Sequence, residues 1–352
     1  MDGSSQKGLD TEPGNDVPSE AACAYPSRRW RAFGASVIGV THTRKGLPNQ
    51  DAVRWYPADN GSERPGPPTV LAVADGHGEA GCVRSNFGSQ FAVEIAVEVL
   101  RQFAIDDKLR GGGSVAEVRE FAHRIISRAV SDKWLSRVSD HHAQSPFTPS
   151  EMQLISGGGD RQCLPPEQRR IFKAYGTTLL AVLATESYLL GLQVGDGAIL
   201  LVNSGGQSHL FIPPHAAHFA NETTSLCSTP VDMAVMVQPL DGDSPVAAML
   251  CTDGYENAFE VDFFRNKLFG EYVEVFSKCH GWREIYRDLP VILEDASQRG
   301  SGDDATMGFI VSDHFERAHD RSGGDTRELA PAEPNESQDL RRLPSDNQAN
   351  ET

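Results

Sequence analysis

The chain has 352 residues, of which 23% are charged and 39% hydrophobic, and it carries a formal net charge of −17. These values are typical of a soluble globular protein with one large domain or two small ones. The sequence pI of about 5.0 argues against binding to nucleic acid or to anionic membranes, because both favour basic surfaces. We therefore expect neither of these partners, and we expect a monomer.

The six cysteines are widely spaced and form no CxxC pair. This spacing argues against a zinc ribbon and suggests no disulfide framework, so we expect reduced thiols in a cytoplasmic protein. The first residues lack the apolar segment of a signal peptide, and no apolar run approaches the roughly 18 residues of a membrane span.

Composition divides the chain into three parts. Residues 1–29 are rich in Gly, Ser, Pro and Glu and predict a disordered leader, and residues 313–352 predict a disordered tail. Residues 30–312 carry periodic apolar patterns and predict one domain. Two stretches interrupt these patterns, at 140–172 and 213–245, and we expect both to be excursions from the core.

The first half of this domain predicts strands followed by two helices. Apolar runs predict strands at 33–40, 52–56 and 69–74. Apolar residues at helical spacing predict helices at 81–103 and 114–138. The second helix begins with a capping box, in which Ser114 precedes Glu117 by three residues.

The second half predicts mainly strands, followed by a helical block and a closing strand. Three closely spaced runs, at 178–184, 188–193 and 198–202, predict an antiparallel meander. Further elements are a strand at 246–251, two helices within 258–299 and a strand at 305–311. Blocks of strands and helical pairs in this order predict an α+β layered domain.

Five aspartates lie where apolar strands end or begin. Asp75, Asp196 and Asp253 each follow a strand and precede a glycine, whereas Asp51 and Asp303 each precede a strand. In antiparallel neighbours the end of one strand lies beside the start of the next, so all five carboxylates can meet at one edge. Because buried carboxylates are costly without a partner, and carboxylate oxygens suit Mg²⁺ or Mn²⁺, the pattern predicts a metal site.

The order of these motifs resembles that of the metal-dependent Ser/Thr protein phosphatases of the 2C type, the PPM family, and especially their bacterial branch. The matching pieces span about residues 33–312 and lie at 46–52, 73–78, 175–178, 194–196, 252–254 and 303–306. The resemblance implies a central β-sandwich of two antiparallel sheets flanked by pairs of α-helices. It also implies a metal centre at one end of the sandwich.

The same resemblance implies a role for each acidic residue. Asp75 would bridge two Mg²⁺ or Mn²⁺ ions, and the carbonyl of Gly76 would bind one of them. Asp253 and Asp303 would bind the other ion, and Asp51 would act nearby, partly through water. A weaker third metal position would be formed by Asp253 together with the remaining strand-end aspartate, Asp196.

The chain departs from the family pattern at two positions. Gln50 stands where many relatives have Glu, and Gly46 stands where eukaryotic relatives have a phosphate-binding Arg. Arg44 and Lys45 lie one or two residues earlier and are our candidates for phosphate binding. Asp304 occupies the usual Asn position beside the metal ligand, where we expect it to serve as a hydrogen-bond partner.

Two bound cations can lower the pKa of a water, hold a phosphate in line and neutralise the leaving oxygen. A serine or threonine alkoxide also needs a proton, and His77 is the candidate general acid. The other interpretation of His77 is a structural role beside the metal site. Asp51 joins His77 in the predicted catalytic set.

The predicted activity is therefore metal-dependent hydrolysis of phosphoserine and phosphothreonine on proteins, in cytoplasmic signalling. The expected partner is a phosphorylated protein substrate, namely a Ser/Thr kinase or its target. Two alternatives remain open. The chain could be a catalytically weak member that binds a phosphoprotein or kinase, or a metal hydrolase of small phosphomonoesters.

Overall fold

Two five-stranded sheets form the centre of the described part of the chain. In spatial order, the first sheet contains β1 (Trp30–Val37), β10 (Ala305–Ser312), β9 (Ala247–Cys251), β6 (Ala198–Val202) and β7 (Ser208–Leu210). The second contains β2 (Ala52–Tyr56), β3 (Thr69–Ala74), β4 (Leu179–Ala184), β5 (Tyr188–Val194) and β8 (Ala234–Pro239). All neighbouring strands in both sheets are antiparallel.

This arrangement comes from a computed structural model, and the sheets and helices lie within the residues that the structure describes. Those residues are 29–58, 68–109, 113–156, 167–203, 205–213, 224–228, 230–241, 244–264, 268–276 and 281–313. Nearly all of the predicted leader and tail, and parts of both predicted excursions, lie outside the described residues.

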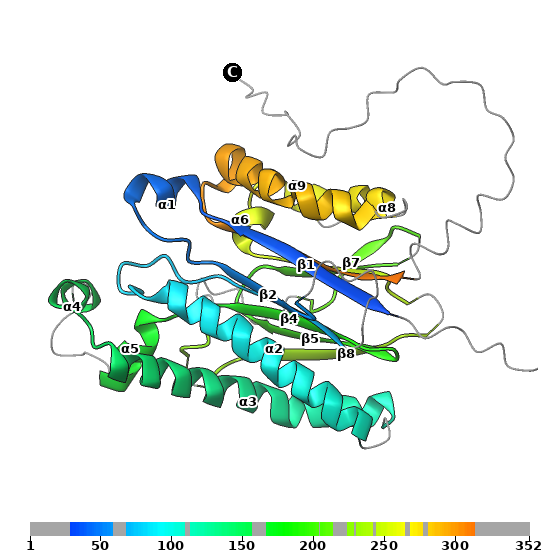
Figure 1. Cartoon of the computed structure of the whole chain (residues 1–352), viewed down its shortest axis with the longest axis horizontal. Coiled ribbons are helices and arrows are strands. Elements are labelled where there is room, and N and C mark those ends of the chain that lie inside the picture. Colours follow the sequence, from blue (N-terminus) through cyan, green and yellow to red (C-terminus); the bar gives the residue numbers. More distant parts are fainter. Residues whose placement is uncertain are drawn as a thin grey trace, which may run out of the picture.

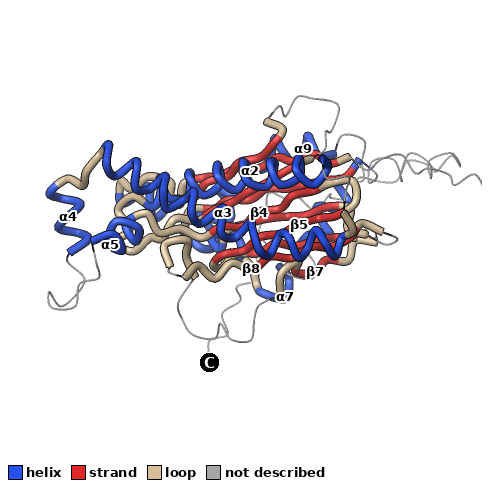
Figure 2. The backbone as a smooth tube through the Cα atoms, turned by 90° about the horizontal axis from the view of Figure 1, so that it is seen from below, coloured by secondary structure: helices blue, strands red, loops and turns tan. Residues whose placement is uncertain are grey.

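Helices cover the outer face of each sheet (Figures 1 and 2). The α-helices of the described residues are α1 (Val40–Lys45), α2 (Ser85–Leu109), α3 (Val115–Gln144), α4 (Pro149–Ser156), α5 (Glu167–Ala174), α6 (Asp253–Glu256), α7 (Val261–Phe263), α8 (Phe269–Phe276) and α9 (Gly281–Ala296). A π-helix, η2 (Ser297–Ser301), follows α9. The pair α2 and α3 packs on the second sheet, and the pair α8 and α9 packs on the first. The predicted α+β sandwich of two antiparallel sheets with flanking helical pairs is therefore confirmed.

The apolar core has three layers, which explains why the strands read as continuous apolar runs. In β3, Leu71 and Val73 face the opposite sheet, whereas Val70 and Ala72 face the helices. In β10, Ile310 belongs to the central layer and Phe309 to the layer under α8 and α9. Because both faces of these strands are covered, no alternation with polar residues is needed.

The predicted meander is wrong in one respect, because its third strand lies in the other sheet. β4 and β5 pair with each other, but β6 pairs with β7 and β9. The chain crosses between the sheets at Gly195 and Gly197, whose φ angles are 89° and 85°. These left-handed conformations favour glycine and turn the chain sharply, and the short connection alone does not distinguish a hairpin from a crossover.

Several elements differ from the sequence-based expectation. β1 begins and ends earlier than predicted, and α1, which follows it, was not predicted. β8 falls inside the excursion at 213–245, α4 falls inside the excursion at 140–172, and α5 begins inside it and ends two residues beyond. β8 lies at a sheet edge, where Val235 and Val237 are buried but Met236 is exposed, so its apolar signal is weak.

None of the helices in the described part of the chain combines the length and the hydropathy needed to cross a bilayer.

Candidate metal centre

The strand-end aspartates converge at one end of the sandwich and come from both sheets. Asp51 precedes β2 and Asp75 follows β3, whereas Asp253 follows β9 and Asp303 precedes β10. Asp196 lies in the crossover between β5 and β6. The charges of these groups act on one another: Asp75 is influenced by Asp51, Asp253 and Asp196. Asp253 is influenced in turn by Asp196 and Asp303.

Asp75 lies at the middle of this cluster. Burial, followed by the charges of Asp51 and Asp253, holds the pKa of Asp75 well above its usual range. Burial also raises the pKa of Asp253, whose carboxyl group forms a hydrogen bond with that of Asp75. The backbone N–H of Asp75 donates to Thr178 Oγ1 at 3.0 Å, and its carbonyl accepts from Thr177 Oγ1 at 2.8 Å. The two threonines therefore fix the position of Asp75.

Asp51 is buried directly before β2, at the edge of the second sheet. Thr252 Oγ1 donates a hydrogen bond to Asp51 Oδ2 at 2.8 Å. Burial raises the pKa of Asp51 to about 8, and the charges of Asp304 and Asp253 act in the same direction. Hydrogen bonds from Thr306 and Thr252 oppose the rise.

The raised pKa values of Asp51, Asp75 and Asp253 indicate whether these residues suit a divalent cation. Without a counter-charge, the buried carboxyl groups coexist only by holding protons at pH values where an ordinary carboxyl group is ionised. An all-oxygen donor set that is short of positive charge suits Mg²⁺ or Mn²⁺. The residues at this end of the sandwich therefore fit the metal that the sequence predicts.

Gln50 and Gly76 bring the backbone close to the same cluster. The carbonyl of Gln50 accepts hydrogen bonds from Gly76 N at 3.1 Å and from Ser89 Oγ at 2.5 Å. A Cβ at Gly76 would lie 2.7 Å from the carbonyl oxygens of Gln50 and Ser85, so no larger residue fits there. The side-chain Oε1 of Gln50 is buried and has no hydrogen-bond partner among the described residues, which leaves an acceptor available to a ligand.

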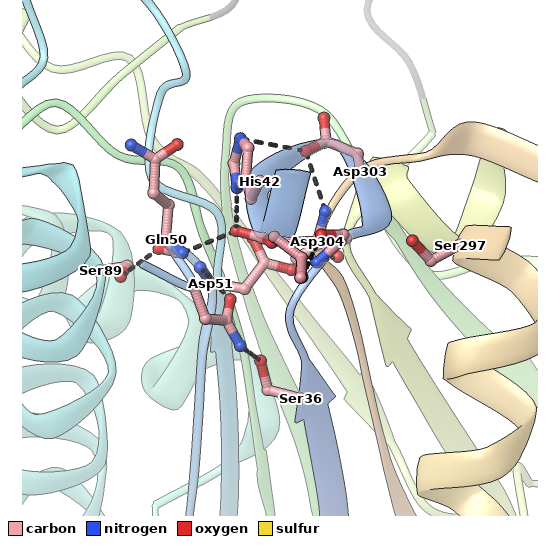
Figure 3. A network of polar contacts seen from close by, with 12 residues as sticks. Ser36, His42, Gln50, Asp51, Ser89, Ser297, Asp303 and Asp304 are labelled. Atoms are coloured by element: carbon pink, nitrogen blue, oxygen red, sulfur yellow. Dashed lines mark hydrogen bonds and ion pairs between the residues drawn. The ribbon is translucent and has the colours of Figure 1, made fainter. Parts of the chain in front are cut away.

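Asp303 and Asp304 differ sharply in their surroundings (Figure 3). The side chain of Asp303 is 56% exposed. Asp304 is buried, and its carboxylate accepts hydrogen bonds from Gly39 N at 2.6 Å, Gln50 N at 2.7 Å and His42 Nδ1 at 2.8 Å. Asp304 thus joins α1, the residue before Asp51 and the start of β10, in keeping with the hydrogen-bonding role expected for it.

His77 lies beside the aspartates on the loop after β3. Its backbone N–H donates to Gly176 O at 3.0 Å, and its ring packs against Gly176, where an added Cβ would lie 2.6 Å from His77 Cδ2. Burial lowers the pKa of His77, and the charges of Asp196 and Glu79 oppose this. The imidazole is therefore held near Asp196 in a partly desolvated position.

The phosphate-binding candidates lie on α1. Arg44 and Lys45 are exposed and share the last turn of α1 with the buried His42. Since His42 contacts Asp304, α1 packs beside the turn before β10, and the basic pair belongs to this helix.

Sequence reasoning missed two residues that shape the site. Thr252 supports Asp51 and directly precedes Asp253, so a hydroxyl at a strand end beside a predicted ligand was an available signal. The second residue is His42. Its contact with Asp304 joins residues 262 positions apart, and no local pattern predicts such a contact.

Residues 38–293 match the family model described as Protein phosphatase 2C. A comparison with curated proteins gave no match. Similar solved structures include the serine/threonine phosphatase Stp1 from Staphylococcus aureus, with 14% identity, coverage of 80% of this chain and 94% of that chain, and a TM-score of 0.47. The serine/threonine phosphatase PstP/Ppp from Mycobacterium tuberculosis has 16% identity, coverage of 80% and 98%, and a TM-score of 0.47.

PppA from Pseudomonas aeruginosa shows a similar level of likeness, with 16% identity, coverage of 81% and 98%, and a TM-score of 0.47. The family assignment does not depend on these distant structures, because the family model alone covers more than half of the chain. The chain therefore belongs to the protein phosphatase 2C family, a family of protein-serine/threonine phosphatases.

Proposed function

We propose that the chain hydrolyses phosphoserine and phosphothreonine on proteins, using a water molecule activated at a pair of Mg²⁺ or Mn²⁺ ions. The observation that supports this most strongly is the convergence of five aspartates from both sheets, with raised pKa values at Asp51, Asp75 and Asp253. When bound, the ions supply an acidified water, orient the phosphate and neutralise charge on the leaving oxygen.

The aspartates divide naturally into ligand groups around Asp75. Its carboxyl group contacts that of Asp253, and the charges of Asp51 and Asp196 raise its pKa. Asp75 is therefore the residue best placed to bridge two ions. Asp253 and Asp303 would hold one ion, and the carbonyl of Gly76 would contribute to the other. Asp51, held by Thr252, would act partly through water.

A third, weaker metal position would use Asp196 together with Asp253. The two carboxylates influence each other electrostatically, which supports a shared cation. The number of ions and the choice between Mg²⁺ and Mn²⁺ are part of this proposal.

His77 is proposed as the general acid that protonates the departing serine or threonine oxygen. Burial lowers its pKa, which makes the imidazolium a stronger acid, and the neighbouring Asp196 charge favours retention of the proton until transfer. Arg44 and Lys45 are proposed to attract the phosphate, since α1, which carries them, contacts Asp304 through His42.

The proposed substrate is a phosphorylated protein, such as a Ser/Thr kinase or a kinase target. The alternative of a catalytically weak binding module gains no support from the site, because the aspartate set is complete. Gln50, which replaces the expected Glu, still offers the buried acceptor Oε1.

The test is phosphate release from a phosphothreonine peptide with Mn²⁺, with Mg²⁺ and with EDTA. EDTA should abolish turnover, and Asp253→Ala should reduce kcat/KM by about a hundredfold or more, since even partners of metal ligands change activity by about 10- to 100-fold. Asp132→Ala, at an exposed position on α3, is the matched control and should behave as the parent protein. Full turnover in EDTA, or parent-like turnover of Asp253→Ala, would refute the proposal.

A further inference from the structure

α1 carries a buried histidine that points at the proposed metal ligand Asp303 (Figure 3). The side chain of His42 is 10% exposed. Its Nδ1 lies 2.8 Å from Asp304 Oδ2, and its Nε2 lies 3.7 Å from Asp303 Oδ1. Both ring nitrogens of His42 therefore face carboxylates, one as a hydrogen bond and one across a wider gap.

The hydrogen bond to Asp304 assigns the proton on the ring. Asp304 already accepts two backbone N–H groups, from Gly39 and Gln50. Because carboxylate oxygens accept hydrogen bonds, we assign the hydrogen of the third bond to His42 Nδ1. In the neutral ring, Nε2 then presents its lone pair toward Asp303.

Two acceptor atoms that face each other repel unless a cation, a proton or a donating water lies between them, and Asp303 Oδ1 also accepts a hydrogen bond from Asp304 N at 2.9 Å. Ligand atoms about 2.1 Å from an octahedral ion lie about 3.0 Å apart when adjacent and about 4.2 Å apart when opposite. The observed 3.7 Å between His42 Nε2 and Asp303 Oδ1 falls between these limits. A carboxylate that orients a histidine, whose other nitrogen binds metal, is a recurrent arrangement in metalloproteins.

The backbone of α1 holds the ring in this position. A Cβ at Gly39 would overlap the backbone of Asp303 and Asp304, so the start of α1 packs directly on the turn before β10. Thr41 N donates to Gly302 O at 2.9 Å, which adds a second tie to that turn. His42 is therefore preorganised and needs no rearrangement to reach an ion beside Asp303.

We propose that Nε2 of His42 is a ligand of the ion held by Asp303, with Asp304 as the residue that orients the ring. This inference rests on the metal centre of the proposed function and adds a nitrogen to its oxygen ligands. Because imidazole suits transition metals better than Mg²⁺, His42 favours Mn²⁺ at this position. The competing arrangement is an imidazolium paired with Asp303, in which His42 touches no metal.

The first test removes Nε2 but keeps the hydrogen bond to Asp304. In His42→Asn, the amide nitrogen lies near the place of Nδ1 and can still donate. Titration of the purified protein with Mn²⁺, followed by electron paramagnetic resonance of the free ion, should show affinity about 10- to 100-fold lower, with a smaller change for Mg²⁺. His123→Asn, at an exposed position on α3, is the matched control and should keep the parent affinity.

The second test detects the bond itself. Pulsed electron paramagnetic resonance of the Mn²⁺-loaded protein should show ¹⁴N modulation from an imidazole in the parent protein. The modulation should persist in His77→Asn and vanish in His42→Asn. Since the spectra of the parent protein and His77→Asn decide the matter together, the test stands even where His42→Asn folds poorly.

The outcomes separate this inference from the proposed function. If the parent protein binds no Mn²⁺, the metal centre itself is wrong. If Mn²⁺ binds with no ¹⁴N modulation, or if His42→Asn retains parent affinity for Mn²⁺, the metal centre stands and the role of His42 as a ligand is refuted.

Discussion

Removal of divalent ions should make the stability of this protein fall as the pH rises from about 4 to about 8. Burial raises the pKa of Asp51 to about 8 in the folded protein, whereas an unfolded chain has an aspartate pKa of about 3.9. Between these values the folded state binds more protons than the unfolded state, so the free energy of unfolding decreases with pH. Below this window the full stability is present, and above it the loss is complete.

The size of the effect follows from the width of the window. One proton contributes about 1.4 kcal/mol per pH unit, so Asp51 alone would remove about 4 kcal/mol between pH 4 and pH 7. At about 2 °C per kcal/mol for a domain of this size, Tm should fall by roughly 8 °C. The raised pKa values of Asp75 and Asp253 act in the same direction.

Thermal unfolding in EDTA between pH 5 and pH 8 measures this decline, and a parallel series with Mn²⁺ should show stabilisation that grows with pH. Asp51→Asn should make the EDTA profile less steep and raise Tm at pH 8, because its amide never ionises, and the contributions of Asp75 and Asp253 should remain. Asp132→Asn, on the exposed face of α3, should reproduce the parent profile. A Tm in EDTA that is constant or rises between pH 5 and pH 8 would contradict the reasoning.

Two further substitutions test packing around the site. Arg84→Met should lower the free energy of unfolding by about 3 kcal/mol in chemical denaturation, because it strands the partly buried Glu151 that Arg84 binds at 2.6 Å. The exposed Arg128→Met should cost less than about 1 kcal/mol, and equal losses would contradict this view. Gly39→Ala should cost about 1–3 kcal/mol and weaken Mn²⁺ binding, because its Cβ overlaps the backbone before β10. Gly81→Ala, which meets no atom within 4 Å, is the control, and a harmless Gly39→Ala would show that this turn adjusts freely.

The strands were predictable because their burial is so complete. Every residue of β3, β4 and β9 is buried, so each strand reads as an unbroken apolar run. The positions of Asp75 and Asp253 were predictable for the same reason. Asp75 directly follows the last residue of β3, and one residue separates Asp253 from the last residue of β9. A costly charge at the end of a buried strand is a local signal, and it survives in a single sequence.

The pairing of strands and the surroundings of His42 were not predictable in this way. The turn at Gly195–Gly197 is as short as a hairpin turn, and only the packing of two sheets decides that β6 leaves the sheet of β5. α1 has six residues and no side-chain cap, so it lacks the usual signals of a helix start. Its contacts with the turn before β10 depend on tertiary packing between distant segments.

The double origin of the acidic cluster determines when ions can act during folding. The second sheet supplies Asp51 and Asp75, and the first sheet supplies Asp253 and Asp303. A folding intermediate that has formed only one sheet holds half of these ligands, so its affinity for a cation should be low. Ion binding should therefore stabilise the state in which the two sheets have packed together, and it should have little effect on the earlier folding steps.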